Sequence, residues 1–180
     1  MSLRPATLNH PDWPGWTRQK TLILPVPASH WAPPAHGVAL DGIDFAPKRE
    51  LHATLIGRAL GRRLRSAIDR GVLEFADVRE MFEAQDWSFR RTDDYLLLRK
   101  REPARGRSRT VHSVIELLEM PAMAGFHRAL GERLRAELPV PPPHVTLYVA
   151  GTRQGIGVPD AAALRALRQR RVDPAELRSR

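Results

Sequence analysis

The sequence predicts a single domain that combines β-strands with α-helices. Its 180 residues suit one domain with a sizeable hydrophobic core. Along the chain, short apolar runs bounded by glycine or proline, which are typical of strands, occur together with segments whose apolar residues recur at helical spacing. This length leaves room for two lobes but not for two independent domains.

The first half of the chain is expected to begin irregularly and then to form strands and a helix. Prolines within residues 1–15 prevent a helix there, so this segment is interpreted as an irregular leader. Strands are expected at 21–26, 38–45 and 51–56, with a proline-dense loop at 27–34. Residues 58–70 carry Leu60, Leu64, Ala67 and Ile68 at helical spacing before Gly71, so they predict an amphipathic helix with an arginine face.

The second half predicts further strands and helices. Short strands are expected at 87–90 and 95–100, turning around 92–94, and another at 111–118. Helices are expected at 77–84, 121–138 and 159–167, and the Gly155-Ile156-Gly157 turn precedes the last of these. We interpret 101–109 as a basic loop, 139–143 as an extended segment that leads into a strand, and 168–180 as a tail that frays.

One short pattern occurs twice in the chain. The two copies are Leu51-His52-Ala53-Thr54-Leu55 and Pro143-His144-Val145-Thr146-Leu147, so each contains histidine, any residue, threonine and leucine. The chain has seven histidines and eight threonines, and chance would give only roughly 0.3 histidines followed two positions later by threonine. The other five histidines lack this context. The repetition therefore indicates a shared role.

The chemistry of these residue types points to phosphoester cleavage. In a strand, side chains two positions apart lie on the same face, so each histidine and its threonine would reach one space. Two imidazoles can divide proton transfer between base and acid near neutral pH, while the threonine hydroxyls donate hydrogen bonds to the phosphate. The alternative is that His52 and His144 are structural histidines and that Thr54 and Thr146 are present for their strand propensity.

The paired His-x-Thr-Leu motifs resemble those of the 2H phosphoesterase superfamily, which includes the RNA 2′,3′-cyclic phosphodiesterases, also called 2′-5′ RNA ligases. The resemblance covers residues 21–167 and implies a bilobal α+β fold with pseudo-twofold symmetry. Two antiparallel sheets would line a central cleft, with the helices outside. Each lobe would supply one motif strand to the cleft, and the whole chain, 1–180, would be one such domain.

This resemblance implies a metal-independent phosphodiesterase without a cofactor. Its catalytic residues would be His52, Thr54, His144 and Thr146, with His144 as base and His52 as acid. Relatives act on RNA cyclic phosphates, ADP-ribose cyclic phosphate and 2′-5′ oligoadenylates, so the expected substrate is a 2′,3′-cyclic phosphate on RNA or a nucleotide, and reversible 2′-5′ ligation stays open. Two alternatives are a non-catalytic basic RNA-binding module on the same fold and a phosphodiesterase for a small nucleotide.

Three further residues are candidates for binding the substrate. Strand alternation places Tyr148 on the face of His144 and Thr146, where it could stack on a base, although a half-buried structural role is an equal alternative. Arg153 follows the same strand and could reach an anion from the rim. Trp31, flanked by prolines, could stack on a nucleobase or anchor its loop to the core. The basic segment 101–109 could follow an RNA backbone or be a solvated hairpin tip.

The composition agrees with an anionic substrate. The net charge is +9, and because only three cationic residues are lysines, the excess is almost entirely arginine, whose guanidinium matches phosphate oxygens. A GC-rich genome would produce the same composition. The chain has no cysteine, no signal-peptide pattern, no apolar membrane span and no His-Glu-x-x-His zinc motif. We therefore expect a cytoplasmic protein with no bound metal, no membrane association and no obligatory protein partner.

Overall fold

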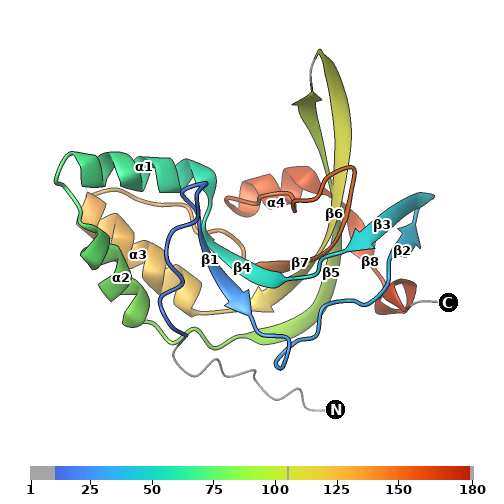
Figure 1. Cartoon of the computed structure of the whole chain (residues 1–180), viewed down its shortest axis with the longest axis horizontal. Helices are drawn as coiled ribbons and strands as arrows, with labels where there is room; N and C mark the ends of the chain where they lie inside the picture. The colour runs from blue at the N-terminus through green and yellow to red at the C-terminus, as the bar shows by residue number, and fades with distance from the viewer. Residues whose placement is uncertain (1–10, 105, 179–180) are drawn as a thin grey trace.

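The computed structural model describes residues 11–104 and 106–178 of an α+β protein (Figure 1). Its helices are α1 (Arg58–Asp69), α2 (Phe75–Glu83), α3 (Ala122–Leu134) and α4 (Ala161–Leu167). Its strands are β1 (Leu22–Val26), β2 (Val38–Leu40), β3 (Ile43–Pro47), β4 (Leu51–Ile56), β5 (Arg90–Ala104), β6 (Arg107–Glu119), β7 (His144–Ala150) and β8 (Arg168–Val172). Within these residues, no helix is both long and apolar enough to cross a membrane.

The strands of the described residues form one antiparallel sheet in the order β1-β4-β7-β6-β5-β8. Strand β3 also pairs with the end of β7, and β2 pairs with β3. The sequence predicted two sheets in two lobes. That arrangement is not seen, because the two motif strands, β4 and β7, pair with each other through Ala53 and Val145 and thereby join both halves of the chain into a single sheet.

Helices α1, α2 and α3 pack on one face of this sheet, which we call the helix face. Leu64 of α1, Phe82 of α2 and Phe126 of α3 are fully buried and share one core with Ala53 and Val145. Trp87 stacks on Phe82, with ring centroids 5.0 Å apart, and its indole N–H donates to the Phe82 carbonyl. Burial of these large aromatic surfaces is the main favourable term for this half of the domain.

The opposite face, which we call the motif face, carries α4 over β5 and β6. A second, smaller core joins Leu98 of β5 and Ile115 of β6 to Ile156 and Val158, and the half-buried Leu164 and Leu167 of α4 pack against it. Figure 1 shows α4 apart from the other three helices. The sheet is therefore covered differently on its two faces.

The C-terminal segment forms a strand and a 3₁₀-helix between residues 168 and 177, so the prediction that 168–180 frays was wrong for most of that segment. Strand β8 pairs with β5, and Val172 is buried in the large core. Arg170 forms ion pairs with Asp41 and Glu176, both at 2.9 Å, and a short 3₁₀-helix, Pro174–Leu177, follows. Strand β8 was not predicted, because three arginines and a glutamine precede its one apolar residue, Val172, and leave no alternating pattern. Residues 179–180, like 1–10 of the leader, lie outside the described residues.

Strands β5 and β6 are longer than predicted. The strand expected at 95–100 lies within β5, whereas of the strand expected at 87–90 only Arg90 belongs to β5. Between Arg91 and Tyr95 the ladder has an irregularity instead of the predicted turn. The predicted basic loop at 101–109 continues both strands as a hairpin that projects from the body of the protein (Figure 1). Cross-strand hydrogen bonds between β5 and β6 hold these residues as strands. The sequence does not reveal them, because an exposed polar strand lacks the alternation of apolar and polar residues that marks a half-buried one.

We expect His127 on α3 to make the protein less stable in acid. Its ring is 1 % exposed, Nδ1 lies 2.9 Å from the Met123 carbonyl to which it donates, and Nε2 is buried without a partner. Burial lowers the pKa of His127, opposed by that hydrogen bond. The unfolded chain therefore binds more protons, and stability falls as the pH drops below about 6.5, by up to about 1.4 kcal/mol per pH unit for one group.

The variant His127→Leu removes this proton-linked loss, so its free energy of unfolding should depend less steeply on pH between 7 and 5, as measured by urea unfolding. His36→Gln is the control, because His36 is exposed to water in the folded protein. Equal slopes for His127→Leu and the unmodified protein would contradict the prediction.

Candidate active site

The structure brings the two His-x-Thr pairs together on neighbouring strands. Ala53 of β4 lies opposite Val145 of β7 in an antiparallel pair, so His52 faces Thr146 and Thr54 faces His144 across the two strands. Ala53 and Val145 point into the large core, which places the four motif side chains on the motif face. Directly opposite residues have Cβ atoms about 4.5–5.5 Å apart. The strand pairing therefore gathers the four motif side chains into one cluster, which we call the motif cluster.

Both motif strands carry a β-bulge at the leucine of the motif. In β4, Thr54 lies opposite Ile23 whereas Ile56 lies opposite Leu22, so the intervening Leu55 is an extra residue. In β7, Thr146 lies opposite Ile115 and Tyr148 opposite Val114, so Leu147 is extra in the same way. Bulges re-aim the side chains that follow them and are common beside active sites. The two motifs thus share a local geometry as well as a sequence.

The bulge in β7 changes the position of Tyr148. Simple alternation predicted this side chain on the face of His144, but after Leu147 it points to the helix face, where it is 5 % exposed and belongs to the large core. Burial raises the pKa of Tyr148. Tyr148 is therefore not part of the four-residue cluster, and the structural alternative holds for it.

Trp31 also belongs to the core instead of the cluster. Its side chain is 7 % exposed, and the guanidinium of Arg91 lies over its ring at 4.0 Å from the ring centroid. Arg91 donates to the fully buried carboxylate of Glu116, which lies opposite Val145 and hence on the helix face. With its ring face covered by Arg91, Trp31 anchors its proline-dense loop.

His144 is held by its own strand and buried, being 7 % exposed. Its Nδ1 lies 2.7 Å from the carbonyl oxygen of Pro142, and because a carbonyl only accepts, Nδ1 carries the hydrogen. In the neutral ring, Nε2 is then the nitrogen with a free lone pair. Burial lowers the pKa of His144, with the hydrogen bond to Pro142 acting in the opposite direction, so the neutral form is favoured near pH 7.

His52 is half-buried and lies among three charged or titratable neighbours. Its pKa is lowered first by burial and then by the positive charges of Lys48 and of His144 when protonated, whereas the carboxylate of Glu50 raises it. Lys48 and Glu50 thus act on the same imidazole in opposite directions. An anion bound at the cluster would add a further negative charge and raise the pKa of His52.

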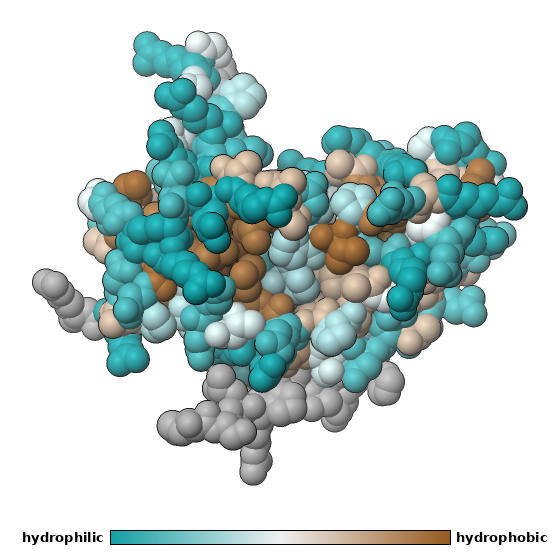
Figure 2. Space-filling view, turned by 180° about the vertical axis from the view of Figure 1, so that it is seen from behind, coloured by the Kyte–Doolittle hydropathy of each residue, from teal (hydrophilic) through white to brown (hydrophobic). Residues whose placement is uncertain are grey.

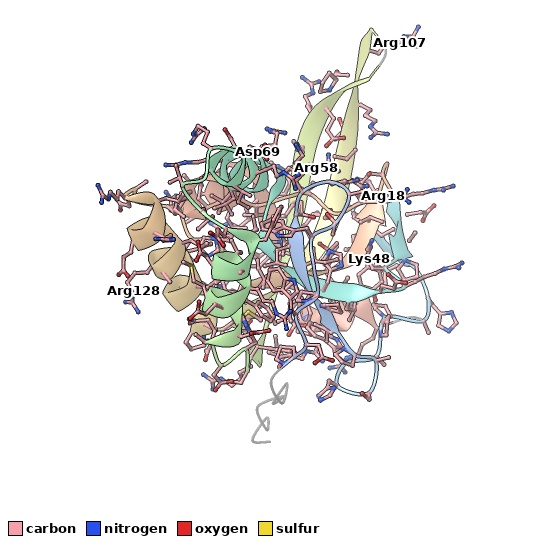
Figure 3. All side chains as sticks on the ribbon, turned by 60° about the vertical axis from the view of Figure 1, so that its left-hand side comes forward. Arg18, Lys48, Arg58, Asp69, Arg107 and Arg128 are labelled. Carbon is pink, nitrogen blue, oxygen red and sulfur yellow. The ribbon has the colours of Figure 1, made fainter. Side chains whose placement is uncertain are left out.

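Lys48 is the residue of this site that the sequence analysis missed. Its backbone N–H donates to the carbonyl of the bulged Leu147 at 2.8 Å, which fixes the segment after β3 beside β7. Its Nζ donates to the Arg153 carbonyl at 3.3 Å. Lysine is rare in this chain, and its position just before the first motif strand was the only available signal. Figure 3 marks Lys48 beside the strands and Arg58 at the start of α1.

Residues 151–158, which we call the strap, run beside the cluster. A Cβ atom added to Gly155 would lie 2.5 Å from Oγ1 of Thr146, so the strap touches that threonine directly. The amide of Ile156 donates to the buried Ser113 hydroxyl at 3.0 Å, and Arg58 donates to Gln154 at 2.8 Å. Arg153 is exposed on this strap, and a position at the rim of the cluster stays a prediction for its side chain.

Two cavities lie away from the four motif residues. One of about 430 Å³ is lined by Trp13, Phe82 and Trp87 among others, and one of about 390 Å³ by Trp16, Gly61 and Phe75 among others. The motif residues instead occupy the surface of the sheet beside the strap. Among residues 11–104 and 106–178, no group of three or more histidine, aspartate or glutamate side chains is placed to hold a metal ion.

Comparisons with models of protein families, with curated proteins and with solved structures found no match to this chain.

We predict that Gly155→Ala displaces the strap or Thr146. The added methyl group would overlap Oγ1 and would also lie 3.2 Å from Cβ of Thr146, a side chain whose β-branching leaves it little freedom to rotate. Overpacking of this kind costs about 1–3 kcal/mol, which urea unfolding measures. Gly157→Ala is a matched control, because nothing lies within 4 Å of its added Cβ. Equal stability of the two variants would refute the contact.

Proposed function

We propose that this protein is a metal-independent phosphodiesterase that hydrolyses 2′,3′-cyclic phosphates of nucleotides or RNA. The observation that carries the proposal is the pairing of Ala53 with Val145, which gathers two imidazoles and two hydroxyls from distant parts of the chain on one face. Two titratable rings and two neutral donors around one point suit a phosphodiester whose hydrolysis takes a proton from water and gives one to the leaving oxygen. If the histidines were only structural, nothing would require a second histidine and threonine on the neighbouring strand opposite the first.

His144 is assigned as the general base. Its Nδ1–H is committed to the Pro142 carbonyl, so the lone pair on Nε2 is available to take a proton from the attacking water. The water oxygen then bonds to phosphorus. Burial keeps His144 neutral near pH 7, which is the form that a base requires.

His52 is assigned as the general acid. As the bond between phosphorus and one ribose oxygen breaks, protonated His52 gives its proton to that oxygen, and the product is a phosphomonoester with a free hydroxyl. Burial and then Lys48 lower the pKa of His52 and make its proton easier to release, whereas Glu50 and the negative charge of the bound substrate raise that pKa and favour the protonated ring that an acid requires. In the reverse, ligating direction, the two roles exchange.

The non-bridging phosphate oxygens are assigned hydrogen-bond donors from Thr54, Thr146 and Lys48. Negative charge gathers on these oxygens in the transition state, and one preorganised donor is worth about 3 kcal/mol. Thr146 is held in place by Gly155, and Lys48 by its hydrogen bonds to the β7 bulge and to the strap. Arg153 is assigned to the rim, where it meets other parts of the substrate.

The two halves of the sheet support the resemblance to the 2H phosphoesterases. Strand β4 with its neighbour β1, and β7 with its neighbour β6, each carry His-x-Thr-Leu with a bulge at the leucine. We propose that these strand pairs correspond to the two lobes of that superfamily, related by a pseudo-twofold axis that passes between Ala53 and Val145. The lobes would then be fused into one sheet instead of forming two.

Replacing either His52 or His144 by alanine should lower kcat for a 2′,3′-cyclic mononucleotide at least about 100-fold, because each removes one proton transfer. The assay resolves the products in EDTA, in which the unmodified protein should stay active. His36→Ala is the control outside the cluster, and circular dichroism checks the fold. Near-normal turnover by both variants, or loss of wild-type activity in EDTA, would contradict the proposal. Salt-sensitive RNA binding without product would favour the non-catalytic module.

The plot of kcat/KM against pH should be bell-shaped, and its alkaline side should report the pKa of His52. Activity should fall in acid as His144 gains a proton and in alkali as His52 loses one. Lys48→Met removes a positive charge that lowers the pKa of His52, so the alkaline limb should move to higher pH. Glu50→Gln removes a carboxylate that raises the same pKa, so that limb should move to lower pH. Shifts in the same direction for the two variants would overturn the assignment.

A further inference from the structure

The hairpin formed by the ends of β5 and β6 leaves the body of the protein. Strand β8 pairs with β5 only as far as Leu98, and β7 pairs with β6 only from His112 onward. Beyond these points, residues 99–104 of β5 pair only with β6, and residues 107–110 of β6 pair only with β5, among the described residues. We call residues 99–104 and 106–110 the ribbon. Past the pair Lys100 and Val111, four further residue pairs extend the ribbon by about 13 Å, at roughly 3.3 Å per residue. Figure 1 shows it projecting.

The ribbon is rich in cationic residues and poor in apolar ones, a composition that contributes little to folding. Its described residues carry five cationic side chains, Arg99, Lys100, Arg101, Arg107 and Arg109, and one carboxylate, Glu102. Glu102 pairs with Lys100 and Arg109 at 3.4 and 3.2 Å. Apart from Pro103 and Ala104 the ribbon has no apolar residues, and a two-stranded hairpin of this kind gains little stability by itself. Figure 2 shows the projection as mostly hydrophilic.

The sign of these charges points to a polyanion. Charged side chains, lysine above all, protect exposed strand edges from aggregation, but four of the five cationic residues of the ribbon are arginines. The excess of positive charge instead matches a chain of regularly spaced negative charges. Arginine also binds phosphate oxygens through two parallel hydrogen bonds. Arg107 near the tip points away from the body of the protein (Figure 3).

The ribbon begins close to the four motif residues. His112, at its base, lies opposite Ala150, and Ala150 is four residues along β7 from Thr146, or roughly 13 Å. The strap links the two places, because its Gly151 packs against the backbone of Thr110 and its Gly155 against Thr146. The exposed Arg153 lies between these two glycines. The strap thus connects the motif cluster to the base of the ribbon and carries one exposed arginine between them.

We propose that the ribbon binds the phosphate backbone of a single-stranded nucleic acid whose terminal phosphate lies at His52 and His144. The position of that terminus rests on the proposed function, whereas binding by the ribbon does not. The substrate class is then an oligonucleotide, and a mononucleotide reacts at the same cluster without contacting the ribbon.

The first test measures binding. Arg101→Gln combined with Arg107→Gln is compared with Arg63→Gln combined with Arg128→Gln, which removes two exposed arginines from α1 and α3. Fluorescence anisotropy uses single-stranded RNA of about ten nucleotides, within the ~4–16 that single-strand sites cover. The ribbon variant should bind roughly tenfold more weakly. The slope of log K against the logarithm of the salt concentration should be shallower by about 1.4, because the variant loses two phosphate contacts and each contact to a single strand contributes about 0.7.

The second test measures turnover with substrates of two lengths. For the same RNA ending in a 2′,3′-cyclic phosphate, the ribbon variant should raise KM roughly tenfold and leave kcat unchanged, in line with the loss of phosphate contacts. For a 2′,3′-cyclic mononucleotide it should change neither constant. The control variant should match the unmodified protein with both substrates.

The outcomes separate the two proposals. If the unmodified protein hydrolyses neither substrate, the proposed function fails, and anisotropy still decides the role of the ribbon. If hydrolysis occurs but the ribbon variant binds RNA as tightly as the control does, the ribbon proposal fails alone. If polyglutamate of matched charge displaces the RNA as well as unlabelled RNA does, the ribbon favours an acidic protein instead, which overturns the proposal.

Discussion

The contact between β4 and β7 at Ala53 and Val145 is the constraint on which the rest of the site depends. A shift of either strand by one residue would turn its histidine and threonine toward the core and its apolar residues toward water. Ala53 and Val145 are both fully buried, so the large core penalises such a shift. The burial of two small apolar side chains on the helix face therefore fixes the positions of four polar ones on the motif face.

A buried polar network lies on the helix face close to this contact. Glu116 lies opposite Val145, is fully buried, and accepts two hydrogen bonds from Arg91. Arg91 also covers the ring of Trp31. A buried carboxylate without a partner would be costly, so the network tolerates only those arrangements of β5, β6 and the Trp31 loop that keep it satisfied. Trp31 thus packs on an arginine whose carboxylate partner lies opposite the motif strand β7.

The elements with strong local signals were predicted closely. Strand β4 has the predicted bounds, because its apolar run ends at Gly57, and α1 follows the spacing of Leu60, Leu64 and Ala67. Elements whose stability comes from distant partners were missed. Strand β8 depends on its ladder with β5 and on the ion pairs of Arg170. The ribbon, likewise, is held by cross-strand hydrogen bonds between polar residues, which carry no periodic signal.

The sequence by itself determined the composition of the candidate site, since two copies of a four-residue pattern name both histidines and both threonines. Only the tertiary structure decided that they meet, because strand pairing between β4 and β7 depends on how the core is buried and not on either segment alone. It also decided which neighbours share the cluster. The bulge at Leu147 turns Tyr148 to the helix face. The hydrogen bond from the backbone N–H of Lys48 to the Leu147 carbonyl places a lysine beside β7. A single extra residue in a strand reverses the facing of every side chain after it, and local sequence does not reveal it.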